Sequence, residues 1–163
     1  MGILAVGLLC YPVTSLTIRP AKGWSLLWAV PASAGTDLCF TWIHSVSKRP
    51  VSETYTIDTD GSLRLLEMAF DHEGPNLPSS PEQGTTWQID GNKVIVTGYD
   101  LRLERLNFGV SPLGHRIAVG LREWDLVAGV GPDRLARLTV ERIPLVLIVV
   151  AEVWQWRHEK SRS

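Results

Sequence analysis

The side chains best suited to chemistry in this chain lie in two short stretches. His44-Ser45 ends an apolar run, Glu53 follows eight residues after Ser45, and Asp71-His72-Glu73 opens a proline-rich segment. A serine nucleophile, a histidine base and a carboxylate that orients the base are the parts of a small hydrolase. Ser45, a histidine, and either Glu53 or Asp71 would supply them. The same stretches also suit zinc or calcium, and the ligands would be His44, Glu53, Asp71, His72 and Glu73.

Neither chemistry has further support in the sequence. Ser45 lacks a G-x-S-x-G turn, and His44, its neighbour in an extended segment, points to the opposite face. HExxH, CxxC and the standard glycine-rich phosphate loops are also missing, so we expect no catalytic residue, no metal ion and no cofactor. A structural interpretation remains, in which His44 and Ser45 hydrogen-bond into the turn Val46–Pro50 and Glu53 reaches a donor of that turn. The donors considered are Lys48 and Arg49.

Composition restricts the class of protein. The 163 residues contain 16 Lys and Arg against 17 Asp and Glu, which gives a formal net charge of -1. Without a positive field the main energy of phosphate binding is missing, so we expect no nucleic-acid partner. A hydrophobic content of 45% excludes a disordered chain, and the length suits one domain. Cys10 and Cys39 lie in unrelated segments and are not expected to pair.

The remaining pattern is that of an all-β protein. From Ser15 onward, short alternating runs separated by turn residues predict a single antiparallel sandwich or partly closed barrel. Asp37–Ser45 places large apolar side chains on one face and predicts a central strand. Glu53–Asp58 and Leu63–Phe70 flank a glycine-closed turn and predict a hairpin. Further strands are expected at 15–19, 24–30, 86–89, 93–97, 115–121, 123–127 and 138–142.

Two features concern loops and helices. Asp71–Gln83 contains three prolines and a glycine, and predicts a loop long enough to be suspected of function. The spacing of glycine and proline predicts that no helix after residue 20 exceeds about three turns. A short helix is expected over Pro132–Leu138, with the proline in its first turn.

Two apolar segments lie near the ends of the chain. Met1–Val13 is uncharged, too short to span a bilayer, and followed by a poor cleavage site, which predicts a leader retained as a signal-anchor remnant. Ile143–Ala151 is rich in β-branched residues and predicts a buried strand; the alternative is membrane contact beside Trp154–Arg157. The expected organisation is an apolar leader over 1–13, an all-β domain over 14–156 and a polar tail over 157–163.

Seven tryptophans are many for this length, and exposed ones would serve a carbohydrate platform, a membrane belt or a protein interface. Trp42 shares the strand face of Leu38 and Phe40, which indicates core packing. Trp154 and Trp156 stand among charged residues and are the better interface candidates.

One longer pattern resembles a known family. Phe40–Val46 forms an aromatic strand that ends in His-Ser-Val, and Pro50–Glu53 follows after a short turn. With these residues the chain resembles the uncharacterised bacterial domain-of-unknown-function 1850 family. The resemblance extends over most of the chain after the leader, through Asn76-Leu77-Pro78, Val96-Thr97-Gly98, Gly114-His115-Arg116 and Glu141–Leu145.

Members of that family are typically encoded beside the substrate-binding protein and fused permease of TAXI-type TRAP transporters. The resemblance implies no known activity. It implies a non-enzymatic accessory protein at the cell inner membrane, with its domain facing the periplasm or outer surface. The partners would be the permease or its solute-binding protein, and the membrane through the N-terminus. The residues expected to form the binding surface are His44, Ser45, Glu53, Leu77, Pro78, His115 and Arg116.

Overall fold

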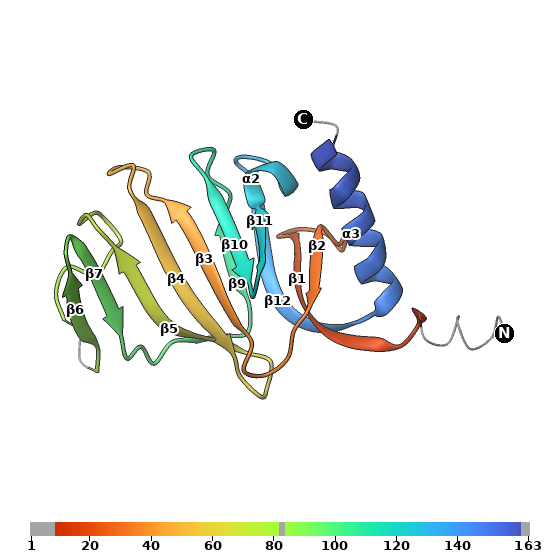
Figure 1. Cartoon of the computed structure of the whole chain (residues 1–163), viewed down its shortest axis with the longest axis horizontal. Helices are drawn as coiled ribbons and strands as arrows, with labels where there is room; N and C mark the ends of the chain where they lie inside the picture. The colour runs from red at the N-terminus through yellow and green to blue at the C-terminus, as the bar shows by residue number, and fades with distance from the viewer. Residues whose placement is uncertain (1–8, 82–83, 161–163) are drawn as a thin grey trace.

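The chain folds into two antiparallel sheets that pack face to face as an open sandwich (Figure 1). This computed structural model describes residues 9–81 and 84–160, and the side chains up to residue 153. The all-β prediction is confirmed. Figure 1 shows the larger sheet running on past the smaller one toward β6 and β7.

The smaller sheet is built on one long ladder between the two ends of the chain. Its order is β2 (Trp28–Pro31), β1 (Pro12–Pro20), β12 (Leu135–Pro144) and β9 (Leu106–Gly109). β1 and β12 pair along their whole length, from Pro12 opposite Pro144 to Pro20 opposite Ala136. The strand expected over 24–30 begins only at Trp28.

The larger sheet contains the strands that position the candidate site. Its order is β11 (Arg122–Asp125), β10 (His115–Val119), β3 (Asp37–Ile43), β4 (Pro50–Ile57), β5 (Leu63–Phe70), β7 (Lys93–Thr97) and β6 (Thr86–Asp90), and β8 (Arg102–Leu103) also pairs with β5. β3 is a central strand, as its sequence predicted. The hairpins β4–β5 and β6–β7 also lie where glycine-containing turns predicted them.

The core lies between the sheets and follows the alternation of the strands. Leu16 and Ile18 of β1 and Leu138 of β12 belong to the same buried cluster as Leu38 and Phe40 of β3. Alternate residues of a strand point to opposite faces, so the intervening positions of these strands lie on the outer faces.

The short helix lies elsewhere than expected. α2 (Leu126–Gly129) begins after Asp125, whose carboxylate accepts the backbone N–H groups of Val127 and Ala128. The prediction of a helix over Pro132–Leu138 is wrong, because the chain from Leu135 onward is recruited into β12 between two partner strands. Pairing with β1 and β9 outweighs the weak preference of so short a helical segment.

The predicted strand over Ile143–Ala151 and the limit of three helical turns are both wrong. After Pro144 the chain forms α3 (Leu145–Lys160), a helix of 16 residues. Pro144 lies opposite Pro12 in the ladder, and since neither has an N–H group, pairing stops there. The following residues contain no glycine or proline, and a buried apolar run alone does not distinguish a strand from a helix. None of the described helices is long and apolar enough to cross a membrane.

α3 is attached to the sandwich through a few buried apolar side chains. Ile148 is buried in a cluster with Ala29 of β2 and Ile143 of β12. On the opposite side of the helix Val150 is exposed. α3 is therefore held to the sandwich through the side of the helix that carries Ile148.

We predict that Ile148→Ala lowers the free energy of unfolding by about 2 to 4 kcal/mol, because it leaves a cavity under α3. Val150→Ala, the matched control, should change it little. Chemical denaturation of both variants measures the difference, and equal losses would show that α3 is not held through Ile148.

Candidate functional site

His44 joins the turn after β3 to the loop after β5. Its Nδ1 accepts the backbone N–H groups of Val46 and Ser47, each at 3.2 Å, and its Nε2 lies 2.9 Å from the carbonyl oxygen of Pro75. Because Nδ1 accepts, the ring proton is on Nε2, which donates to Pro75. The imidazole is buried and both of its nitrogens are occupied by the backbone. The structural interpretation of His44, as a group that hydrogen-bonds within its turn, is confirmed.

The loop after β5 is held against this histidine at several further points. A Cβ added at Gly74 would lie 2.8 Å from Cε1 of His44, so the loop approaches the ring more closely than a larger residue permits. Arg49 Nε donates to Asp71 Oδ1 at 3.0 Å, and a second nitrogen of Arg49 contacts Oδ2. Farther along the loop, Leu77 is buried in a small cluster with Phe70. These contacts fix the loop to the end of the larger sheet.

Glu53 does not reach the turn, and that prediction is wrong. In the ladder Glu53 lies opposite Phe40, three residues into β4, and its Oε2 accepts the hydroxyl of Tyr55 at 2.7 Å. Three residues of strand correspond to roughly 10 Å, too far for the carboxylate to bind the turn. Arg49, the expected partner, pairs with Asp71 instead. Burial first, and the charge and hydrogen bond of Glu53 after it, raise the pKa of Tyr55, which therefore stays protonated as the donor.

Ser45, His44 and the acids are not arranged as a hydrolase or as a metal centre. Ser45 is exposed on the turn, while both nitrogens of His44 are used elsewhere. Within 9–81 and 84–153, where side chains are described, no three histidine, cysteine or acidic side chains come close enough together to hold a metal ion. His72 and Glu73, proposed as ligands, therefore share no such group with His44 or Glu53.

His115 and Arg116 begin β10, which pairs with β3. His115 lies opposite Trp42, its Nδ1 accepts the N–H of Ser111 at 2.8 Å, and its ring stacks on Phe40. Burial lowers the pKa of His115, which agrees with a neutral ring that accepts at Nδ1. Arg116 points to the other face and pairs with Glu123 at 3.0 Å. His115 thus packs against β3, the strand that leads to His44, whereas Arg116 pairs with Glu123 of β11.

Three connecting segments meet at this end of the larger sheet. They are residues 44–49, 71–81 and 111–114, here called the His44 edge. The turn between β3 and β4 and the turn before β10 lie at the top of Figure 1. The third segment is joined to β3 where Gly114 accepts the N–H of Ile43 at 3.1 Å. Val46 and Leu113 are exposed apolar side chains on this edge. Of the seven predicted residues, this edge contains His44, Ser45, Leu77 and Pro78. His115 and Arg116 directly follow its third segment as the first residues of β10, and Glu53 lies inside β4.

The comparison with known families bears on this edge. Residues 38–126 match the family described as Domain of unknown function (DUF1850). The chain belongs to the DUF1850 family. No curated protein and no solved structure matches it. The matched range runs from β3 into α2, and it contains every segment of the His44 edge of this DUF1850 protein.

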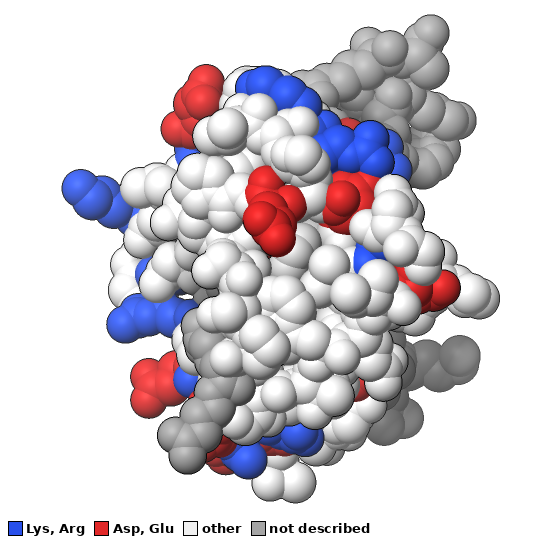
Figure 2. Space-filling model, turned by 90° about the vertical axis from the view of Figure 1, so that its left-hand side faces the viewer, with Lys and Arg blue, Asp and Glu red and all other residues white. Residues whose placement is uncertain are grey.

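On the side where β6 and β7 lie, the charged side chains of the DUF1850 protein are of mixed sign. Figure 2 shows acidic and basic side chains scattered singly or in mixed groups there, around a wide area that carries neither. This mixture of signs agrees with the balanced composition of the chain.

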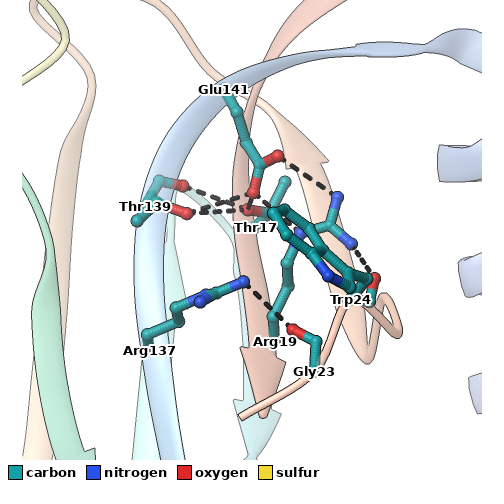
Figure 3. A network of polar contacts seen from close by, with 7 residues as sticks. All are labelled: Thr17, Arg19, Gly23, Trp24, Arg137, Thr139 and Glu141. Atoms are coloured by element: carbon teal, nitrogen blue, oxygen red, sulfur yellow. Dashed lines mark hydrogen bonds and ion pairs between the residues drawn. The ribbon is translucent and has the colours of Figure 1, made fainter. Parts of the chain in front are cut away.

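A second polar group of this DUF1850 protein was not expected from sequence. On the outer face of the smaller sheet, Glu141 Oε1 accepts from Thr17 at 2.6 Å, from Arg19 at 2.9 Å and from Thr139 at 3.1 Å (Figure 3). Burial by itself raises the pKa of Glu141, but the hydrogen bonds and the charge of Arg19 outweigh it and hold the pKa below its usual range. Polar residues alternate with apolar ones along β1 and β12, and this alternation could have predicted a polar outer face. It could not predict that Thr17, Arg19 and Glu141 contact one another, because that depends on the register of the β1–β12 ladder.

The same group holds the loop between β1 and β2. Arg19 also donates to the carbonyl oxygen of Trp24, and Arg137 donates to that of Gly23 at 3.1 Å. The guanidinium of Arg137 lies 5.7 Å from the centre of the exposed Trp24 ring (Figure 3). Both arginines thus tie this loop to the sheet, and the group acts as a structural clasp.

We predict that Gly74→Ala separates the loop from His44, since the added methyl group meets an imidazole that is fixed at both nitrogens. The free energy of unfolding should fall by about 1 to 3 kcal/mol, and proteolysis within 71–81 should become faster. Gly109→Ala is the control, because a Cβ there meets only an ordinary contact at 3.6 Å. Equal stability and equal cleavage of the two variants would contradict the close approach.

We predict that Glu141→Gln destabilises the protein by roughly 1 to 2 kcal/mol at neutral pH, because it weakens charge-assisted hydrogen bonds. The folded pKa of Glu141 lies below its ordinary value of 4.5, so this stabilisation is complete above that value and is lost as the pH falls through the folded pKa. Unfolding curves across the acidic range should show this loss in the native protein and not in Glu141→Gln. Glu123→Gln, which breaks only the exposed pair with Arg116, should leave the pH dependence unchanged.

Proposed function

We propose that this DUF1850 protein is a non-enzymatic, membrane-associated interaction module that serves a TAXI-type TRAP importer and binds its permease or solute-binding protein through the His44 edge. The observation that carries the proposal is the use of both nitrogens of His44 to hold two loops together. A histidine engaged in this way is unsuited to proton transfer. It is well suited to fixing a recognition surface.

The His44 edge has the properties of a preformed binding surface. Its loops are tied by the His44 contacts, by the pair Arg49–Asp71 and by the burial of Leu77. A surface that is ordered before binding loses little conformational entropy on binding. Val46 and Leu113 supply exposed apolar side chains amid polar neighbours, the usual composition of an interface centre with its rim.

The hydrolase and the metal site that the sequence left open gain no support from this geometry. Nucleophilic catalysis needs a base in contact with the nucleophile and an oxyanion site. Ser45 is exposed, and the hydrogen bonds of His44 go to Val46, Ser47 and Pro75. The partner and the location come from the family resemblance, with the domain facing the periplasm or outer surface. The apolar stretch Met1–Val13 supplies the anchor in this proposal, although its last two residues, Pro12 and Val13, already belong to β1.

The proposal is tested by recovering the permease and solute-binding protein with the full-length protein from cells that express all three. Val46→Asp places a charge on the His44 edge without removing a buried contact, and should reduce recovery about tenfold or more, a loss of roughly 1.4 kcal/mol. Leu121→Asp is the matched control, since Leu121 is fully exposed on the β10–β11 turn and lies outside the His44 edge. It should not change recovery.

Solute uptake gives an independent measurement. Deleting the gene should reduce uptake, and restoring it with Val46→Asp should not recover the native rate. Unchanged uptake in the deletion strain would remove the transporter as partner. Hydrolysis of an ester, peptide or phosphate substrate that is abolished by Ser45→Ala would overturn the non-enzymatic assignment.

A further inference from the structure

The first half of α3 is apolar on all sides, but the sandwich covers only one of them. Ile148 and Ala151 are buried, and Ile148 packs with Ala29 and Ile143. The side chains on the other side are exposed, with Val150 at 58%. A helix that is apolar all round is normally surrounded by apolar material. The exposed members are Leu147, Val149, Val150 and Val153.

This exposed side continues into the start of the chain. The N–H of Leu145, the first residue of α3, donates to the carbonyl oxygen of Tyr11 at 3.0 Å. Leu9 and Tyr11 are themselves exposed. Figure 1 shows the start of β1 passing beside the base of α3. We call the six exposed residues the α3 apolar face, and they are Leu9, Tyr11, Leu147, Val149, Val150 and Val153.

The sequence around this face carries no charge. Met1–Ile18 and Ile143–Ala151 contain no lysine, arginine, aspartate or glutamate. The first charge after the uncharged stretch of α3 is Glu152, which pairs with Arg122 and directly precedes Val153, the last residue of the apolar face. Two uncharged segments from opposite ends of the chain thus emerge side by side, with a polar border.

We propose that the α3 apolar face lies in the interfacial layer of a phospholipid bilayer, beside the apolar N-terminal segment. The inference rests on the membrane association proposed above and adds a second contact to it. Lipid suits this surface because the backbone groups within α3 are bonded inside the helix, so an apolar surrounding leaves few of them unpaired. Ile143–Ala151 is far shorter than the roughly 20 residues that span a bilayer, so α3 would be a surface contact and not a span.

This contact would determine the orientation of the protein relative to the membrane. Figure 1 places α3 and the start of β1 at one end of the long axis, and β6 and β7 at the other. The His44 edge belongs to the larger sheet and shares no residue with the α3 apolar face. Lipid contact would therefore leave the His44 edge free for a protein partner.

The test uses the full chain with an environment-sensitive fluorophore at Val150→Cys, in a background of Cys10→Ser and Cys39→Ser. The control carries the same label at Ile89→Cys, an exposed position of β6 at the other end of the molecule. With vesicles of phosphatidylcholine and phosphatidylglycerol, we expect a blue shift of the label at 150 and its quenching by lipid-borne quenchers. The label at 89 should keep the emission seen in water.

Each outcome decides the inference. A label at 150 that stays in water while the chain is bound to vesicles overturns the second contact and leaves the N-terminal anchor intact. A blue shift of the label at 150 in the absence of vesicles, together with a dimer in sedimentation, would assign the α3 apolar face to contact with a second copy of the chain. That result also overturns the proposed lipid contact. In the otherwise native chain, Val150→Asp should weaken vesicle binding and Ile89→Asp should not. Recovery of the transporter by the Val46→Asp variant tests the proposed function separately.

Discussion

The pairing of β1 with β12 is the constraint on which most of the molecule depends. It joins the two ends of the chain, as in the hydrogen bond between Thr17 and Glu141, which are 124 positions apart. The inner side of the ladder supplies Leu16 and Ile18 to the core, and the outer side carries the clasp around Glu141. Where the ladder ends, at Pro12 and Pro144, the N-terminal segment and α3 are brought together. One pairing therefore sets the core, the clasp and the α3 apolar face.

The DUF1850 match covers residues 38–126 and leaves this ladder outside. The two parts nevertheless share one core, because Leu16, Ile18 and Leu138 pack in the same cluster as Leu38 and Phe40. Without β1 and β12 the inner face of the larger sheet would lose its cover and expose those side chains to water. The matched range thus contains the proposed recognition surface, while its stability depends on strands that flank the range on both sides.

Local patterns predicted most strands of both sheets, but they predicted neither the pairing of distant strands nor the positions of the helices. Alternation identified β3, and glycine-containing turns identified two hairpins, because these signals lie within a few residues of one another. The helix after Pro144 was misassigned, since a run of apolar residues fits either a buried strand or a buried helix. Glu53 was placed at the turn by its distance in sequence, but the register of the ladder decides its neighbours. The role of Gly74 depends on packing against His44 and has no local signature.

The chemistry of His44 shows how burial and hydrogen bonding decide what a histidine does. With Ser45 as nucleophile and Glu53 or Asp71 as the orienting acid, the sequence would allow it as a catalytic base, yet each ring nitrogen is bound to the backbone of a loop. To act as a base the ring would have to free Nδ1 from both Val46 and Ser47, or lose the Nε2 proton that it donates to Pro75. In either case the loops would lose a contact that fixes them. Catalysis and loop fixation are therefore alternatives at this position. The geometry favours fixation, so the properties of the His44 edge belong to its exposed residues, such as Val46, and the histidine beneath them provides the support.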